Sequence, residues 1–171
     1  MFLDLLKKRR SIRQFTEQPV EKEKIDLLVE AMLRSPSSRG LNPWEFVVVT
    51  DRLLVDDLAK AKAHGSSFMK NGPLAIVVCG DPARGDVWVE DCSIAALIIH
   101  LAATDLGLGS CWIQIRMRDH DGKITAEEYV KKLLGLRENL TVEAIIAIGY
   151  PKEEKLGHAL ASLPFDKVRY L

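Results

Sequence analysis

The sequence predicts an α+β fold in one domain that spans residues 1–171, with a loose C-terminal segment. Three observations support this prediction. The 171 residues are 47% apolar and 28% charged, which is typical of a soluble globular chain with a sizeable core. Four apolar runs read as buried strands, and helical periodicities fall before and between them. We find no repeat, linker or low-complexity segment that would divide the chain.

The four apolar runs have the features of buried strands. Each is short, rich in Val or Ile, and bounded by turn-forming or polar residues. The first contains Phe46 followed by three valines, and the second ends at Gly80-Asp81-Pro82. The expected strands cover residues 45–50, 74–79, 110–115 and 142–148.

Five helices are expected around these strands. Asp51 is placed to cap the third helix, and Thr125-x-x-Glu128 has the form of a capping box ahead of the fifth. The first four cover residues 2–8, about 21–34, 53–63 and 86–106. The apolar residues of the second recur on one helical face: Ile25, Leu28, Val29, Met32 and Leu33.

The longest helix, residues 86–106, has an unusual apolar pattern. Between Ile94 and Leu101 it is apolar nearly all round, which exceeds what one helical face presents to its own core. A chain of this size has little room to surround such a helix, whereas two copies meeting on a twofold axis can bury both helices. The pattern therefore favours a homodimer.

Charge and composition disfavour several classes of protein. Lys plus Arg and Asp plus Glu both number 24, so the formal net charge is zero and no nucleic-acid partner is expected. The start of the chain lacks the features of a signal peptide, and the most apolar stretch, residues 93–103, is too short to span a bilayer. We expect a cytoplasmic protein with no membrane partner.

The cysteines and histidines also suggest a reducing compartment, and they give no sign of a metal site. Cys79, Cys92 and Cys111 form no CxxC pair, which suggests a reducing compartment without disulfides. Cys79 and Cys92 lie in apolar runs and are expected to be inert core thiols. The four histidines are scattered, so no metal site is expected.

Residues 7–15, Lys-Lys-Arg-Arg-Ser-Ile-Arg-Gln-Phe, carry a dense group of cations and one hydroxyl. Such a group could bind a phosphate through forked, charge-assisted hydrogen bonds. A solvated helix end is the alternative, because cations also suit the negative pole of a helix. On composition alone, the helix end is the favoured explanation.

Two further segments carry candidate binding groups. Residues 35–46 are dense in hydroxyls and amides that could meet a polar ring, although such a loop is more often a plain connection. Gly107-x-Gly109 could suggest a dinucleotide-binding turn. That fingerprint follows a strand, opens a helix and has a third glycine, whereas these glycines follow a helix and precede a strand. The dinucleotide interpretation therefore fails.

Together, in this order, these segments resemble the FMN-dependent nitroreductase family, especially its short bacterial and archaeal members. The resemblance covers essentially the whole chain. It rests on Arg-Arg-Ser-x-Arg-x-Phe at residues 9–15, Pro-Ser-Ser closing on Asn-Pro-Trp-x-Phe at 36–46, Gly-Leu-Gly-Ser-Cys-Trp-Ile at 107–113, and Ile-Gly-Tyr-Pro at 148–151.

The resemblance implies a mostly antiparallel central sheet flanked by helices, in an intertwined homodimer with two FMN sites at the interface. Arg9 and Ser11 would hold the FMN phosphate with Arg10 alongside, and Arg13 would reach the pyrimidine edge of the flavin. The ring would be met by a loop from the partner subunit and by one strand, partly through backbone groups. The loop residues are Pro36, Ser37, Ser38, Arg39 and Asn42, and the strand residues are Trp112, Ile113 and Gln114.

The chain departs from the family pattern at two of these positions. Asn42 stands where relatives often carry Gln, so one ring contact could be shortened. Relatives often close the phosphate site with a late Lys-x-Arg, of which only Lys155 is matched here. The insert that covers the substrate in larger relatives is short, near Asp86 or residues 118–125.

The implied activity is hydride transfer from NADH or NADPH, through FMN, to a nitroaromatic, a quinone or a similar small-molecule electron acceptor. The reactive chemistry belongs to the flavin N5, so no catalytic acid, base or nucleophile is expected from the protein. Two alternatives remain open: an FMN-binding storage or sensor module without useful turnover, and a specialised member that removes halogen or fragments flavin. If dimer formation and flavin binding are linked, a charged substitution at Ala96 or Ile99 should reduce FMN binding.

Overall fold

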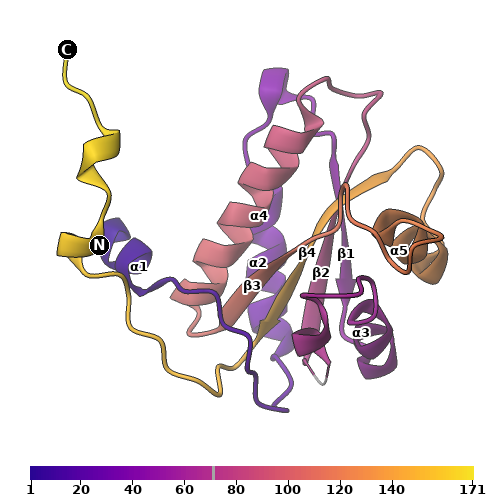
Figure 1. Ribbon diagram of the computed structural model, residues 1–171, viewed down its shortest axis with the longest axis horizontal. Coiled ribbons are helices and arrows are strands. Elements are labelled where there is room, and N and C mark those ends of the chain that lie inside the picture. Colours follow the sequence, from indigo (N-terminus) through magenta and orange to yellow (C-terminus); the bar gives the residue numbers. More distant parts are fainter. Residues whose placement is uncertain (71) are drawn as a thin grey trace.

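The computed structural model describes residues 1–70 and 72–171, and its centre is a four-stranded antiparallel sheet (Figure 1). The strands are β1 (Trp44–Val49), β2 (Leu74–Gly80), β3 (Gly109–Gln114) and β4 (Thr141–Gly149). They lie in the order β1-β2-β4-β3, with every neighbouring pair antiparallel. All four expected strands are confirmed, and the antiparallel sheet agrees with the family resemblance. β3 ends the sheet, so one of its edges has no strand neighbour.

The helices also fall where they were expected, with one difference in length. They are α1 (Phe2–Lys8), α2 (Lys22–Leu33), α3 (Arg52–Leu58), α4 (Trp88–Asp105) and α5 (Ala126–Leu134). Short 3-10 turns occur at Ser38–Gly40, Ser67–Met69, Leu160–Ser162 and Phe165–Lys167.

The prediction that the third helix continues to residue 63 is wrong. α3 ends at Leu58, and the amides of Lys60 and Ala61 bond three residues back, as in a tightening last turn. The buried hydroxyl of Ser66 then donates to the carbonyl of Ala59 at 2.8 Å and so takes an acceptor that a longer helix would use. The helix is ended by a contact from seven residues further along the chain.

The expected caps are present. The Asp51 carboxylate accepts the Leu54 amide at 2.9 Å, and Thr125 and Glu128 form a reciprocal capping box at the start of α5. Gly135 ends α5 in the left-handed conformation, with φ of 62°. Local side-chain chemistry therefore fixes both ends of α5.

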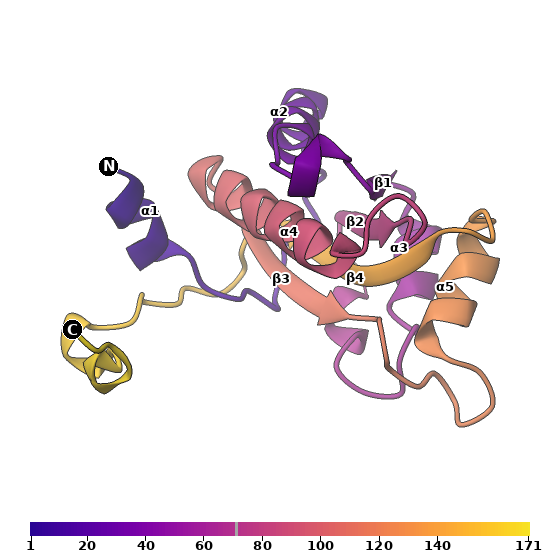
Figure 2. The same cartoon turned by 90° about the horizontal axis from the view of Figure 1, so that it is seen from above.

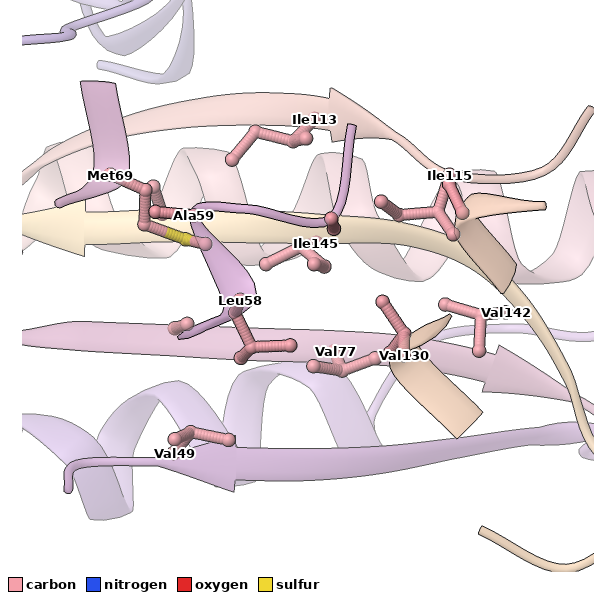
Figure 3. Packing of buried hydrophobic residues seen from close by; sticks show 14 of the residues in the cluster. Val49, Leu58, Ala59, Met69, Val77, Ile113, Ile115, Val130, Val142 and Ile145 are labelled. Atoms are coloured by element: carbon pink, nitrogen blue, oxygen red, sulfur yellow. The ribbon is translucent and has the colours of Figure 1, made fainter. Parts of the chain in front are cut away.

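Helices cover both faces of the sheet. On one face, α3 and α5 pack over inward side chains from all four strands, such as Val49, Val77, Ile113 and Ile145 (Figure 3). On the other face, α2 and α4 lie over the alternate side chains of the same strands (Figure 2). The central strands β2 and β4 are buried on both faces, which explains their continuous apolar sequence, whereas the edge strands β1 and β3 are partly exposed.

α4 presents two different apolar faces. Ala96 and Ile99 are fully buried in the chain's own core, whereas Ile94 is 41% and Leu97 is 50% exposed. The expectation that a charge at Ala96 or Ile99 probes the dimer interface is therefore corrected. Such a charge would disrupt the core of one chain. Leu97 is the residue that probes the outer face.

α1 and the C-terminal segment stand apart from the rest of the chain in both views (Figures 1 and 2). Neither buries apolar side chains well. The exposed apolar residues in these segments are Phe2, Leu3, Leu6, Leu156, Leu160, Leu163, Phe165, Val168, Tyr170 and Leu171. Many exposed large apolar side chains are thus concentrated in two short segments.

The three cysteines are free and buried. Burial raises the pKa of the Cys79 thiol to about 12 and raises those of Cys92 and Cys111 as well. Thiols with such pKa values are poor nucleophiles at neutral pH, as expected for Cys79 and Cys92. Within the described residues, none of the helices combines the length and apolarity that a membrane span needs.

Candidate functional site

The free edge of β3 is where the N-terminal segment meets the sheet. Ser11 forms a parallel bridge with Ser110, and the Ile12 amide donates to the Ser110 carbonyl at 3.0 Å. This approach requires glycine at position 109, because a Cβ there would lie only 2.8 Å from the Cβ of Ile12. The glycine thus permits the 9–13 segment to lie against the sheet edge.

Three cations and a hydroxyl gather at this edge, and we call Arg9, Ser11, Arg13 and Lys155 the cationic cluster. Lys155 Nζ donates to the Ser11 carbonyl at 3.1 Å. Burial raises the pKa of Cys111, while the positive charges of Arg13, Lys155 and Arg9 and a hydrogen bond from Ser11 all act to lower it. All four residues therefore lie within electrostatic or hydrogen-bonding range of Cys111.

Glu153 organises this cluster. One of its carboxylate oxygens accepts the Arg13 amide at 2.8 Å and lies 2.9 Å from Lys155 Nζ. These contacts lower the pKa of Glu153, so it is ionised at neutral pH. Arg10 points elsewhere, because its guanidinium donates to the Leu156 carbonyl. Of the three cations predicted at the phosphate, Arg9 and Lys155 lie near Ser11 and Arg13, whereas Arg10 instead holds the C-terminal segment.

A buried histidine lies behind the cluster. His100, on α4, is 8% exposed, and its Nδ1 lies 2.7 Å from Ser110 Oγ. Burial, followed by the charge of Arg9, lowers the pKa of His100 to about 4, so the ring is neutral at neutral pH. His100 thereby supports the strand residue that bridges to Ser11 without adding a charge.

The Pro36–Asn42 loop lies against the other end of α4. The Ser38 amide donates to Asp91 Oδ1 at 2.9 Å, and Asp91 is only 3% exposed. Ser37 Oγ contacts both the amide and the side chain of Asn42, at 2.9 and 2.7 Å. Arg39 and Asn42 hold positive φ angles of 55° and 47°, a strained conformation for residues other than glycine.

A cavity of about 340 Å³ separates this loop from α4. Pro36, Ser37 and Ser38 line one side of it, and helix residues including Asp91 and Ile94 line the other. Arg39 also reaches the start of the helix by pairing with Asp86. The loop is thus held in a strained shape by contacts to α4.

The cationic cluster and the loop do not meet within one chain. The loop binds α4 at Asp91, whereas the cluster lies beside His100, about 13 Å further along a helix that rises 1.5 Å per residue. The predicted site residues therefore form two separate groups.

The side chains of the three predicted β3 residues already have partners within the chain. Trp112 Nε1 donates to Gln114 Oε1 at 3.0 Å, and Gln114 Nε2 donates to the Arg116 carbonyl at 3.1 Å and lies 3.4 Å from Glu143. Ile113 points into the core under α3 and α5 (Figure 3). Backbone groups alternate sides along an antiparallel strand, and the Ser110 carbonyl faces the N-terminal segment, so the groups of Trp112 and Gln114 face the free edge while those of Ile113 face β4.

Sequence reasoning missed Asp91, His100, Glu143 and Glu153. Asp91 and His100 did carry a signal, since each is a polar residue within a helix that is otherwise apolar. Glu143 similarly precedes an apolar run in β4, where burial raises its pKa. Glu153 carried no such signal in the sequence, because its role depends on the fold, which brings it next to the amide of Arg13.

Comparisons with known proteins identify the family and the fold of the chain. The family model for the nitroreductase family matches residues 6–66 and 54–150. A structure described as an FMN-dependent nitroreductase from Clostridium difficile R20291 superposes with a TM-score of 0.96 at 47% identity, covering 98% of each chain.

Two curated relatives are similar along most of their length. An Archaeoglobus fulgidus protein, provisionally named an NADH dehydrogenase/NAD(P)H nitroreductase, is 37% identical over 157 residues, 90% of this chain and 87% of its own. A Thermus thermophilus protein named NADH dehydrogenase is 28% identical over 198 residues, 94% of this chain and 91% of its own. From its fold, its motifs and these matches, the chain belongs to the nitroreductase family.

Proposed function

We propose that this protein is an FMN-dependent oxidoreductase that takes hydride from NADH or NADPH and passes it to a nitroaromatic, a quinone or a similar small acceptor. The observation that carries the proposal is the cationic cluster at the free edge of β3. The FMN named for the C. difficile structure and the NAD(P)H named for the A. fulgidus relative support the choice of cofactor and donor.

The cluster fits the phosphate of FMN. A phosphate dianion requires cations and hydroxyl donors, and charge-assisted hydrogen bonds are the strong ones. Arg9, Arg13, Lys155 and Ser11 surround Cys111, while Glu153 is tied to Lys155 and to the amide of Arg13. Arg9, Lys155 and Ser11 supply the charge and the hydroxyl donor that a phosphate needs, and they would bind it.

The edge of β3 fits the flavin ring. An edge strand presents unpaired backbone groups, and a planar heterocycle with nitrogen and oxygen atoms can bind to them. Arg13 would stabilise negative charge on the pyrimidine portion of the ring, which raises its reduction potential. When bound, FMN supplies hydride chemistry at its N5. The protein's residues hold and orient it, and none of them has to act as a catalytic acid or base.

The same geometry supports an intertwined homodimer of single-domain chains. The loop and the cluster lie apart on α4, so a site that uses both requires the loop of a second copy. The outward Ile94 and Leu97, α1 and the C-terminal segment all need a covering surface. A second copy supplies it, and obligate dimers of this kind bury about 2,000 Å² or more. Three free thiols are in keeping with the reducing cytoplasm.

The test begins with the colour of the purified protein. It should be yellow, with about one FMN per chain as a stoichiometric phosphate site requires. NADH or NADPH should bleach the flavin within the turnover time, and an added quinone should restore the colour. Bleaching without reoxidation, or no bleaching, would indicate a storage or sensor module. Protein that stays colourless and takes up no added FMN would overturn the proposal.

A further inference from the structure

A second cavity, of about 540 Å³, lies beside Arg13. Two stretches of chain form one wall: the Lys152 amide donates to the Gln14 carbonyl and the Thr16 amide to the Tyr150 carbonyl, each at 2.8 Å. The segment around Phe68 forms the opposite wall. The lining residues are Arg13, Gln14, Phe15, Thr16, Glu17, Phe68, Lys70 and Lys152.

The charges of this cavity are unbalanced. Arg13, Lys70 and Lys152 all line it, and none of these side chains has a carboxylate at ion-pair distance among the described residues. Glu17 is the acidic lining residue in that part of the chain, and it is paired with Arg52 at 3.5 Å, outside the lining. The cavity therefore has a net positive charge that an anion can neutralise.

The cavity also has aromatic walls. Phe15 and Phe68 are partly buried members of the core margin. The guanidinium of Arg13 lies 5.8 Å from the centroid of the Phe68 ring. Aromatic faces beside a planar cation suit a flat ligand, which can stack while its charged group meets the lysines.

We propose that this cavity is the acceptor subsite and that it selects planar aromatic acceptors carrying a carboxylate or sulfonate. The inference rests on the proposed function, because Arg13 belongs both to this cavity and to the proposed pyrimidine contact. A ligand in the cavity is thereby placed next to the flavin ring, with Lys70 and Lys152 around its anionic group.

The test compares 4-nitrobenzoate with neutral 4-nitrobenzamide. In each turnover NAD(P)H gives up a hydride, and the nitro group takes that hydride and one solvent proton to become a nitroso group and water. The ratio of kcat/KM for the two acceptors should favour the carboxylate. Lys70→Gln and Lys152→Gln should each lower this ratio roughly twofold to fivefold, as expected for exposed charge pairs. The double variant should lower it further.

Lys132→Gln, which removes an exposed lysine on α5, is the matched control and should leave the ratio unchanged. Binding of 4-nitrobenzoate, measured by calorimetry on the purified protein, gives a second readout that needs no turnover. It should weaken in the two cavity variants and at high salt, which screens exposed charges.

The outcomes separate this inference from the proposed function. If nitrobenzamide is reduced but neither the ratio nor carboxylate binding depends on Lys70 and Lys152, the subsite is overturned and the oxidoreductase stands. If neither acceptor is reduced while carboxylate binding depends on both lysines, the proposed activity and the acceptor role of the cavity fail, and only its binding of aromatic anions stands.

Discussion

The two ends of α4 hold different parts of the candidate site. At its C-terminal half, the chain's own fold gathers Arg9, Ser11, Arg13 and Lys155 around Cys111. At its N-terminal half, Asp91 holds a strained loop, and Asp86, just before the helix, pairs with Arg39 of that loop. Each end is held by defined hydrogen bonds, and the two groups lie apart on the helix. This contrast is the basis of the proposal that one chain carries two half-sites, which two chains would combine into a whole site.

The largest expected effect comes from placing a charge on the inner face of α4, and the same charge on its outer face gives the comparison. Ile99→Lys buries an unpaired ammonium in the core of one chain and should cost more than about 4 kcal/mol, enough to unfold most domains of this size. Leu97→Lys lies on the half-exposed outer face and should leave the fold intact while abolishing both the dimer and the bound FMN.

Thermal melts, light scattering and flavin content, measured together, distinguish these results. A Leu97→Lys protein that remains a flavin-loaded dimer would show that the outer face of α4 is not the interface. An Ile99→Lys protein with normal melting would contradict the packing of α4 against the sheet.

The next effect concerns the cluster end of α4 and its pH dependence. The pKa of His100 is lowered from 6.5 to about 4, mainly by burial and then by Arg9. Below pH 6.5 the unfolded chain therefore binds a proton that the folded chain does not, so stability falls as the pH drops from 6.5 toward 4. The loss should reach about 3 kcal/mol, at roughly 1.4 kcal/mol per pH unit.

Urea unfolding of the FMN-free protein between pH 7 and 4.5 measures this slope. His100→Asn should flatten the part of the slope due to residue 100, whereas removing the exposed His64 should not. Equal slopes for wild type and His100→Asn would mean that His100 titrates normally.

The smallest of these effects tests the phosphate contact. Arg9→Ala should weaken FMN binding by roughly tenfold to a hundredfold, since a charge-assisted hydrogen bond contributes about 1.5–3 kcal/mol. Arg34→Ala removes a surface pair with Glu30 and is the control, with FMN affinity unchanged. An Arg9→Ala protein that binds FMN normally but melts early would show that Arg9 serves only to end α1.

Local sequence signals predicted most of the fold. The strands follow from their apolar, β-branched runs, and both ends of α5 follow from its capping box and Gly135. The end of α3 did not follow, because the Ser66 hydroxyl that takes the Ala59 carbonyl arrives through the tertiary fold. Local patterns thus predict elements well, and they fail where a distant side chain ends one.

The candidate site was predicted less completely for the same reason. Arg9, Ser11, Arg13 and Lys155 come together as the family resemblance implied, while Arg10 turns to the Leu156 carbonyl. Such a divergence between neighbouring arginines depends on the path of the C-terminal segment, which sequence spacing does not reveal. The apolar excess of α4 could be read from the sequence. Only the structure shows which of its residues face outward.

Mixing two inactive variants tests the two-chain site most directly. Arg9→Ala damages the cluster end, and Asn42→Val damages the loop by placing a β-branched residue at a φ of 47° and removing the Ser37 contact. Each variant alone should bind little FMN. Unfolded together and refolded in equal amounts, they should regain about a quarter of the wild-type flavin sites, because each mixed dimer on a twofold axis contains one site with both halves intact. If the site lies within one chain, the mixture will bind no more FMN than the separate variants, and the account is contradicted.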